Sequence, residues 1–214
     1  MSKEQDRIYV HRPFGPVFCE FSISEKTIIN LNKWVDDLSK NSDLRKKLNY
    51  GKNLAGQVTE EILVPEEIGK QGIGPELSKA IQTYILNTTG KNMKKLEFMS
   101  IWIVRQYGGE YNPIHYHGGH LSGAGWLKLP SGWGAAKQED KKYNYNGKIQ
   151  FIHGSRMFNC KSEFTIEPKV GKMFIFPAYL MHTVYPFYGD EERRSIAFNA
   201  QIDEELYNVY SAKV

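Results

Sequence analysis

From residue 96 onward the sequence is a succession of short apolar runs separated by glycine, proline and polar turn residues. The first run, Leu96 to Val104, is apolar at nearly every position, as expected for a strand that is covered on both faces. Further runs of strand length are found at residues 122–129, 149–153, 164–167, 172–176, 182–185 and 194–200. Short strands at this spacing, preceded by helices, predict a mainly β fold: a jelly-roll β-sandwich braced by N-terminal helices.

Two helices are expected before residue 96. A capping box formed by Ser22 and Glu25 precedes apolar residues at helical spacing, so a helix should begin there. A second helix is expected from Pro75 to Gly90, because proline favours the first helical turn and glycine the end of a helix. Each helix has an ordinary apolar stripe, and we expect both to pack on one face of a sheet.

The composition bears on location and on the class of partner. The net charge of +4, from 28 Lys and Arg against 24 Asp and Glu, suits an anionic co-substrate but lacks the dense basic signature of a nucleic-acid-binding protein. No apolar run is long enough to span a bilayer, and the charged start carries no signal segment. Cys19 and Cys160 form no Cys-x-x-Cys pair or disulfide framework, so a reducing cytoplasm is the expected location.

Three histidines form the strongest chemical signal. On a strand, residues i and i+2 share a face, so His115 and His117 can reach one ion. His182 follows a glycine turn, an apolar strand and a proline, which would place a third imidazole near a strand end. Imidazole suits iron, zinc, copper and nickel. Each histidine alone also fits an ordinary surface or core position, but together they predict a metal site, with His120 as a spare candidate.

A candidate anion site follows His182 with the spacing His-x10-Arg-x-Ser. Arg193 and Ser195 share one strand face, opposite Arg194, and a guanidinium with a neighbouring hydroxyl can grip a carboxylate. Arg194 is the rival anchor if the strand register is shifted by one residue. Alternatively, Arg193 pairs with an adjacent glutamate in a solvated loop.

In their order along the chain, these motifs resemble the prolyl 4-hydroxylase-type Fe(II)- and 2-oxoglutarate-dependent oxygenases. Residues 107–115 (Tyr-Gly-Gly-Glu-Tyr-Asn-Pro-Ile-His) are similar to the segment before the metal motif, and residues 122–130 (Ser-Gly-Ala-Gly-Trp-Leu-Lys-Leu-Pro) to the strand after it. Residues 171–182 resemble the segment that carries the distal histidine. The resemblance is nearest to small, mostly uncharacterised bacterial and phage members with a His-x-His motif, and it covers residues 96–201.

The resemblance implies a cupin-like double-stranded β-helix, with Fe(II) and O₂, and with 2-oxoglutarate decarboxylated to succinate as a co-substrate. No linker splits the chain, so we expect one domain over residues 1–214, in which residues 1–95 support a core formed by residues 96–201. The metal ligands implied by the resemblance are His115, His117 and His182. Those implied for co-substrate binding are Arg193 and Ser195 at the distal carboxylate, with Tyr107 and Tyr111 lining the pocket. Packing roles for both tyrosines are the alternative.

One departure from the family pattern affects the expected chemistry. The larger family has a carboxylate at the position of His117. A neutral histidine there removes one negative charge from the set of metal ligands. Asp140, Glu110 or Glu163 could supply a carboxylate only if the fold brought it to the site. The hypotheses are therefore a 2-oxoglutarate-dependent hydroxylase, a three-histidine dioxygenase that does not use 2-oxoglutarate, and a catalytically silent jelly-roll binding or structural module.

The substrate is the least constrained part of the prediction. By analogy, we expect a protein or peptide, with a prolyl side chain as the leading choice, or a small molecule. The loop of residues 137–148 mixes charge with aromatic rings at Lys141 to Tyr145, but this run is short and Glu139 and Asp140 interrupt the basic character of the loop, so a nucleic-acid partner is not expected. We expect no membrane association and a bacterial cytoplasm, or that of a phage-infected host, with a homodimer retained as an option.

Overall fold

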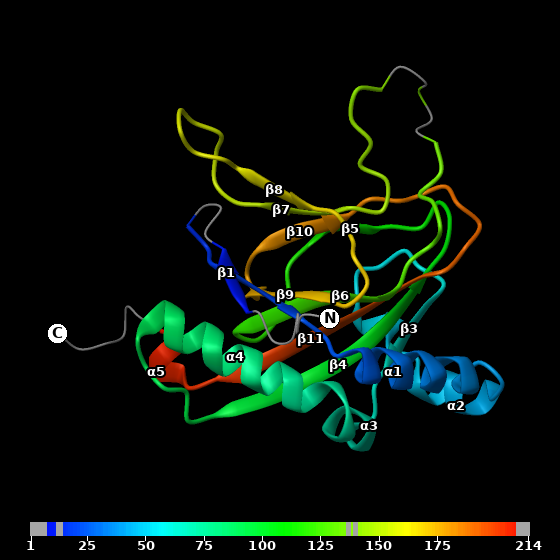
Figure 1. The fold of residues 1–214 in the computed structure, drawn as a ribbon, viewed down its shortest axis with the longest axis horizontal. Coiled ribbons are helices and arrows are strands. Elements are labelled where there is room, and N and C mark those ends of the chain that lie inside the picture. Colours follow the sequence, from blue (N-terminus) through cyan, green and yellow to red (C-terminus); the bar gives the residue numbers. More distant parts are fainter. Residues whose placement is uncertain (1–7, 12–14, 136–137, 139–140, 209–214) are drawn as a thin grey trace, which may run out of the picture.

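The computed structural model describes residues 8–11, 15–135, 138 and 141–208 and consists of two antiparallel β-sheets that lie face to face (Figure 1). The mainly β fold with N-terminal helices, a double-stranded β-helix of the jelly-roll type, is thereby confirmed. Pro13, Lys137, Glu139 and Asp140 lie outside the described residues. None of the described helices combines the length and the apolar character needed to cross a bilayer.

The two sheets differ in size. The strands of the larger sheet are, in spatial order, β1 (Tyr9–His11), β2 (Phe18–Ser22), β9 (Lys172–Pro177), β6 (Leu121–Lys128), β11 (Arg193–Ile202), β4 (Leu96–Gln106) and β3 (Glu60–Leu63). Those of the smaller sheet are β5 (Asn112–His115), β10 (Met181–Val184), β7 (Ile149–Ile152) and β8 (Glu163–Ile166). The strand runs expected from the sequence therefore all form strands, with shifts of a few residues at their ends.

Helices cover the face of the larger sheet that points away from the smaller one (Figure 1). They are α1 (Glu25–Leu38), α2 (Ser42–Leu48), α3 (Glu66–Gln71), α4 (Ile73–Thr89) and α5 (Glu204–Tyr207), with a 3₁₀ turn η1 (Gly51–Asn53). The helix predicted up to Gly90 is present as α4, and Gly90 ends it in the left-handed conformation at φ 71°. The N-cap of α1 is Ser24, because Ser22 still belongs to β2.

Two apolar clusters follow from the alternation of side chains across the larger sheet. On β11, Ile196 and Phe198 face the helices and belong to the outer cluster, which includes Leu31 of α1 and Leu77 of α4. The inner cluster fills the space between the sheets, and its aromatic members are Phe18, Trp126, Phe151, Phe174 and Phe176. Arg193, Ser195 and Ala197, which alternate with these residues along β11, therefore point between the sheets and line a cavity there.

Candidate metal and co-substrate site

The structure brings the three predicted histidines together between the sheets. His115 on β5 and His182 on β10 are direct cross-strand partners, so their rings meet with centroids 4.3 Å apart. His117 lies just beyond β5, where its backbone N–H donates to the carbonyl of Ala178 at 2.9 Å. One ring nitrogen from each histidine lies within 4.8 Å of the other two. The geometry suits a single metal ion.

Backbone carbonyls determine which ring nitrogens are free. His115 Nδ1 lies 2.7 Å from the carbonyl oxygen of Pro113, and His182 Nδ1 lies 2.9 Å from that of Leu180. A carbonyl only accepts, so Nδ1 of each ring must carry the proton, which leaves Nε2 with a lone pair. His182 Nε2 is also 3.2 Å from His117 Nε2, so a ring nitrogen of the third histidine lies beside this lone pair. The three histidines could therefore provide three nitrogen ligands to one metal ion.

Burial keeps the three imidazoles neutral. Desolvation, with smaller contributions from His182 and His115, lowers the pKa of His117 to about 2. The pKa of His182 falls to about 3, again through burial first, and burial also lowers the pKa of His115. The rings of Phe151 and Phe176 pack on His182 at 5.3 and 5.1 Å, and they exclude water from it. Near neutral pH, protons would therefore compete little with a metal ion.

A cavity of about 210 Å³ opens beside the histidines. Its floor is the inner face of the larger sheet, and loop residues 53–55 and 116–117 close it from the side. Its lining includes all three histidines together with Arg193 and Ser195. Thus the metal and anion motifs, which are separate in the sequence, contribute to a single pocket.

Arg193 is a buried cation that lacks an anionic partner. Its side chain is only 3% exposed, and its Nη1 donates to Gln106 Oε1 at 2.6 Å. Its Nε has no hydrogen-bond partner, and no Asp or Glu in the described ranges forms an ion pair with it. Burial lowers the pKa of Arg193 to about 10, so it still carries its charge at neutral pH. Such an arginine in a cavity wall fits a carboxylate ligand.

Two neighbours extend the donor set around Arg193. Ser195 follows on the same face of β11 and is paired across the sheet with Trp126 of β6. Trp126 also lines the cavity, and its buried indole N–H has no partner in the described structure. Trp126 Nε1 and Arg193 Nε are thus two buried donors in the cavity wall that an anionic ligand could satisfy.

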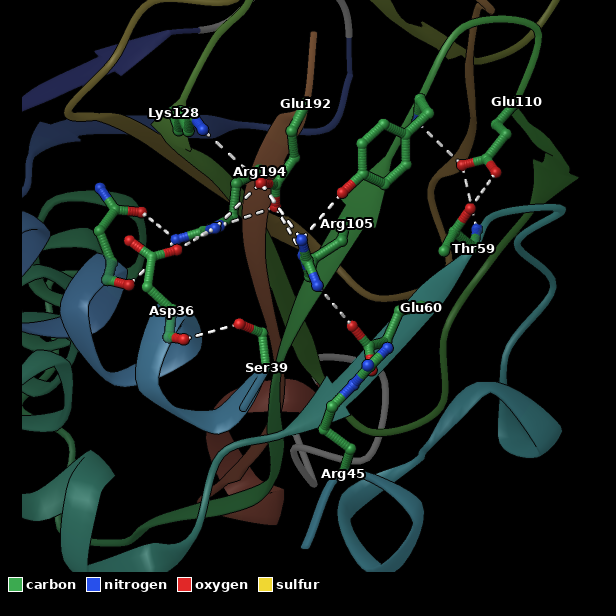
Figure 2. Close-up of polar contacts among 12 residues, drawn as sticks. Asp36, Ser39, Arg45, Thr59, Glu60, Arg105, Glu110, Lys128, Glu192 and Arg194 are labelled. Carbon is green, nitrogen blue, oxygen red and sulfur yellow. Dashed lines mark hydrogen bonds and ion pairs between the residues drawn. The ribbon is translucent and has the colours of Figure 1, made fainter. Parts of the chain in front are cut away.

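The rival arginine has a different environment. Arg194 is 1% exposed, and its guanidinium donates to Glu192 at 2.9 and 3.0 Å and to Asp36 at 2.7 Å. Figure 2 shows it pointing toward Asp36 of α1 and joined through Glu192 to Arg105 and Lys128. Arg194 therefore connects the sheet to α1 and does not line the cavity, which leaves Arg193 as the candidate anchor.

We expect Arg194→Ala to lower the free energy of unfolding by about 3 kcal/mol, because it removes one partner of a buried ion pair. Burial raises the pKa of Glu192, but the hydrogen bonds from Arg194 and Arg105 outweigh it and lower the pKa to about 2. The Asp36 side chain is 63% exposed and should contribute little. Urea unfolding followed by tryptophan fluorescence measures the change. Arg193→Met, which breaks no ion pair, is the control, and equal stability of the two variants would contradict the assignment.

The two tyrosines expected at the co-substrate pocket lie outside this cavity. The Tyr107 hydroxyl accepts a hydrogen bond from Arg105 Nη2 at 2.8 Å, on the charged network outside the cavity. Tyr111 is 42% exposed, and its backbone pairs with Gln57. Neither is among the residues that line this cavity, and a role for them in co-substrate binding stays a prediction. The chain turns after Gln106, and it is Gln106 that reaches Arg193.

Of the three carboxylates considered from the sequence, the two that the structure describes, Glu110 and Glu163, do not lie at the histidines. Glu110 accepts hydrogen bonds from the backbone of Thr59 and Tyr107, as Figure 2 shows for Thr59. Glu163 accepts from Gln150 at 3.0 Å, and Asp140 lies outside the described part of the chain. The carboxyl group that does line the cavity is that of Glu61 on β3. The sequence signal that could have revealed Glu61 is the pair of glutamates at the start of this strand. Because neighbouring side chains on a strand point to opposite faces, one of the two must face the inside of the fold.

The spare histidine is not at the site either. His120 Nδ1 accepts from the backbone N–H of Ile202 at 3.1 Å, and its ring stacks on Tyr207 at 4.0 Å. Its contacts are with the segment around α5, and it is absent from the cavity lining. His120 is therefore a structural histidine, as its spacing from His117 suggested.

Comparisons with known proteins agree with this geometry. Residues 100–199 match the model of a family described as "Putative 2OG-Fe(II) oxygenase". This match includes the three histidines, Arg193 and Ser195. No curated protein matches the chain.

Solved structures show the same fold at low identity. A viral collagen prolyl hydroxylase from Paramecium bursaria Chlorella virus 1, in complex with 2-oxoglutarate, is 16% identical with a TM-score of 0.54, over 86% of this chain and 94% of that one. A prolyl-4-hydroxylase from Pseudomonas putida is 13% identical, with a TM-score of 0.56 and coverages of 86% and 91%. A prolyl hydroxylase from Trichoplax adhaerens, bound to a hypoxia-inducible factor peptide fragment, is 13% identical, with a TM-score of 0.53 and coverages of 92% and 87%. The family match, the shared fold and the three convergent histidines together confirm the resemblance of this chain to the prolyl 4-hydroxylase-like Fe(II)- and 2-oxoglutarate-dependent oxygenases.

Proposed function

We propose that the chain forms a single domain over residues 1–214 that acts as an Fe(II)- and 2-oxoglutarate-dependent oxygenase. The observation that carries the proposal is that Arg193, buried and without an anionic partner, lines the same cavity as three neutral imidazoles. A metal ion alone would not explain a buried unpaired guanidinium, and an anion site alone would not explain three convergent lone pairs. A chelating dicarboxylate accounts for both features.

His115, His117 and His182 would hold the iron through Nε2. When bound, Fe(II) and 2-oxoglutarate activate O₂ for hydroxylation of the substrate, with release of succinate and CO₂. The carbonyls of Pro113 and Leu180 hold two of the rings in the tautomer that presents Nε2 to the cavity. The tilted ring of Trp102, at 5.7 Å from His117, packs against the third ligand.

Arg193, Ser195 and Trp126 would bind the distal carboxylate of 2-oxoglutarate. Arg193 supplies the positive charge, and the hydroxyl of Ser195 and the indole N–H of Trp126 supply further donors. Gln106 accepts from Arg193 Nη1 at 2.6 Å and donates to the carbonyl of Glu110 at 2.6 Å, so it holds the guanidinium in place. Gln106 is thus a positioning residue.

A three-histidine dioxygenase that does not use 2-oxoglutarate is the second candidate. The neutral His117, in a position where the larger family has a carboxylate, favours it, because the donor set then resembles that of three-histidine iron sites. The spacing of Arg193 and Ser195 after His182 favours the first candidate, because both residues line the cavity beside the histidines and together suit the distal carboxylate of 2-oxoglutarate. The catalytically silent module remains the third outcome.

Anaerobic titration of the metal-free protein with Fe(II) and then with 2-oxoglutarate tests the proposal. A weak visible metal-to-ligand charge-transfer band is expected when both ligands share the site. If iron binds but no band forms, the second candidate takes precedence. If no iron binds, the oxygenase proposal fails and the silent jelly roll replaces it.

As substrate we propose a protein, a peptide or a small molecule, and a prolyl side chain is the leading choice. The support is analogy of fold with prolyl hydroxylases, one of them bound to a peptide fragment. We place the protein in the cytoplasm, in line with its two free cysteines. A homodimer is kept as part of the proposal.

A further inference from the structure

Glu61 is a buried acid in the wall of the candidate site. It lies on β3 at the end of the larger sheet, and its side chain is 3% exposed. It is paired across the sheet with Val104, which is in turn paired with Ser195 on β11. All three line the cavity, so Glu61 and Ser195 share one face of the sheet, two strand spacings or about 10 Å apart.

The carboxyl group of Glu61 has no partner in the described structure. Its Oε1 is fully buried and makes no hydrogen bond. The contrast with the preceding residue is informative: Glu60, on the opposite face of β3, is paired with Arg45 at 2.8 Å and Arg105 at 3.0 Å. The chain therefore neutralises one of two adjacent buried glutamates and leaves the other facing the cavity alone.

The loop between α2 and β3 is shaped around this carboxyl group. Its two ends are tied down: the N–H of Tyr50 donates to the carbonyl of Glu61 at 2.8 Å, and the N–H of Gln57 donates to the carbonyl of Tyr111 at 2.9 Å. A Cβ at Gly56 would lie only 2.6 Å from Glu61 Oε1. Glycine at position 56 therefore lets the loop pass over the acid, while residues 53–55 line the cavity beside it.

An unpartnered acid in this position favours a cationic ligand. Burial raises the pKa of Glu61 to about 7, since no cation stands beside it to favour ionisation. The only arginine that lines the cavity, among the described residues, is Arg193, at the other end of the β3–β4–β11 row. A ligand that brings its own positive charge would complete the ion pair that the chain leaves open.

We propose that Glu61 binds a protonated nitrogen of the primary substrate, so that the substrate is an amine or carries a basic side chain or free amino terminus. This inference rests on the proposed function in taking the cavity as the substrate site. The cavity would then have two poles, with Arg193 taking the carboxylate of the co-substrate and Glu61 the cation of the substrate. The three histidines line the same space as both poles.

The test compares two ring-shaped probes of matched size, the cation pyrrolidinium and the neutral ether tetrahydrofuran. Binding to the full-length, metal-free protein is measured by ligand-detected NMR at constant ionic strength. We expect pyrrolidinium to bind at least about tenfold more tightly, the ratio given by one charge-assisted hydrogen bond. Because neither metal nor 2-oxoglutarate is present, this result is independent of the Fe(II) titration.

Glu61→Gln is expected to abolish the preference for the cation, and the matched control Glu60→Gln to retain it. Glu61→Gln should also leave the melting temperature unchanged or raise it, because it removes an uncompensated buried acid. A purely structural role for Glu61 predicts the opposite, a fall in melting temperature with no change in probe preference.

Equal binding of the two probes to the wild-type protein, or no binding of pyrrolidinium, overturns the proposal without the need for any variant. A preference that persists in Glu61→Gln overturns it as well, because another group must then bind the cation. If the cation preference is present but the Fe(II) titration fails, the proposed oxygenase function falls while the cation site stands.

Discussion

Arg193→Met is expected to weaken 2-oxoglutarate binding by about 10²-fold or more while leaving Fe(II) binding intact. The guanidinium is buried, charged and directed at the cavity, and it offers an unpartnered Nε. A charge-assisted hydrogen bond is worth about 1.5–3 kcal/mol, so losing a two-pronged contact removes at least two powers of ten in affinity. The measurement is the concentration of 2-oxoglutarate that half-saturates the charge-transfer band of the Fe(II)-loaded protein.

Two controls separate binding from folding in this experiment. Arg193→Lys keeps the charge but not the planar fork, so it should recover part of the affinity. Arg194→Lys alters the neighbouring arginine, whose partners are Glu192 and Asp36 outside the cavity, and should leave the 2-oxoglutarate affinity unchanged. If Arg193→Met binds 2-oxoglutarate as tightly as the wild type, the assignment of the anion site is wrong.

His182→Ala is expected to reduce Fe(II) affinity by two orders of magnitude or more. His182 lies close to both of the other imidazoles, with its Nε2 only 3.2 Å from that of His117 and its ring centroid 4.3 Å from that of His115. Its removal leaves two neutral ligands, and loss of an outer hydrogen bond alone already costs about 10- to 100-fold in typical metal sites. Anaerobic Fe(II) titration with a colorimetric chelator as competitor measures the affinity.

His120→Ala is the matched control for this variant. His120 is close to His117 in the sequence, but it hydrogen-bonds to the backbone of Ile202 and stacks on Tyr207. Its removal should leave Fe(II) affinity unchanged, although it can lower stability slightly. An Fe(II) affinity that depends on His120 and not on His182 would show that the metal is held elsewhere.

Much of the site could be predicted because local periodicity carries the information. The two-residue repeat of β11 was sufficient to separate Arg193 and Ser195 from Arg194, and the structure places them on opposite faces as expected. The glycine at position 90 and the proline at position 75 marked α4 through backbone preferences that act within a few residues. Such signals need no knowledge of the rest of the fold.

Other features depend on which strands become neighbours. Tyr107 lies one residue after Gln106, and the turn there directs the tyrosine to Arg105 and the glutamine to Arg193. Glu61 is about fifty residues from the nearest site motif, and only the pairing of β3 with β4 brings it to the cavity. The short helices α2 and α3 were also missed, since six or seven residues give too little periodicity to recognise.

The sequence by itself determined the strand-rich class of the fold, the residue types able to hold a metal and an anion, and the faces on which they stand. These properties follow from the alternation of side chains along a strand, which is local. Only the tertiary structure decided that His115 and His182 are cross-strand partners, that Arg193 is left without a carboxylate, and that Glu61 faces the same cavity. Sheet pairing and burial are properties of the whole packed chain, and no segment of the sequence encodes them alone.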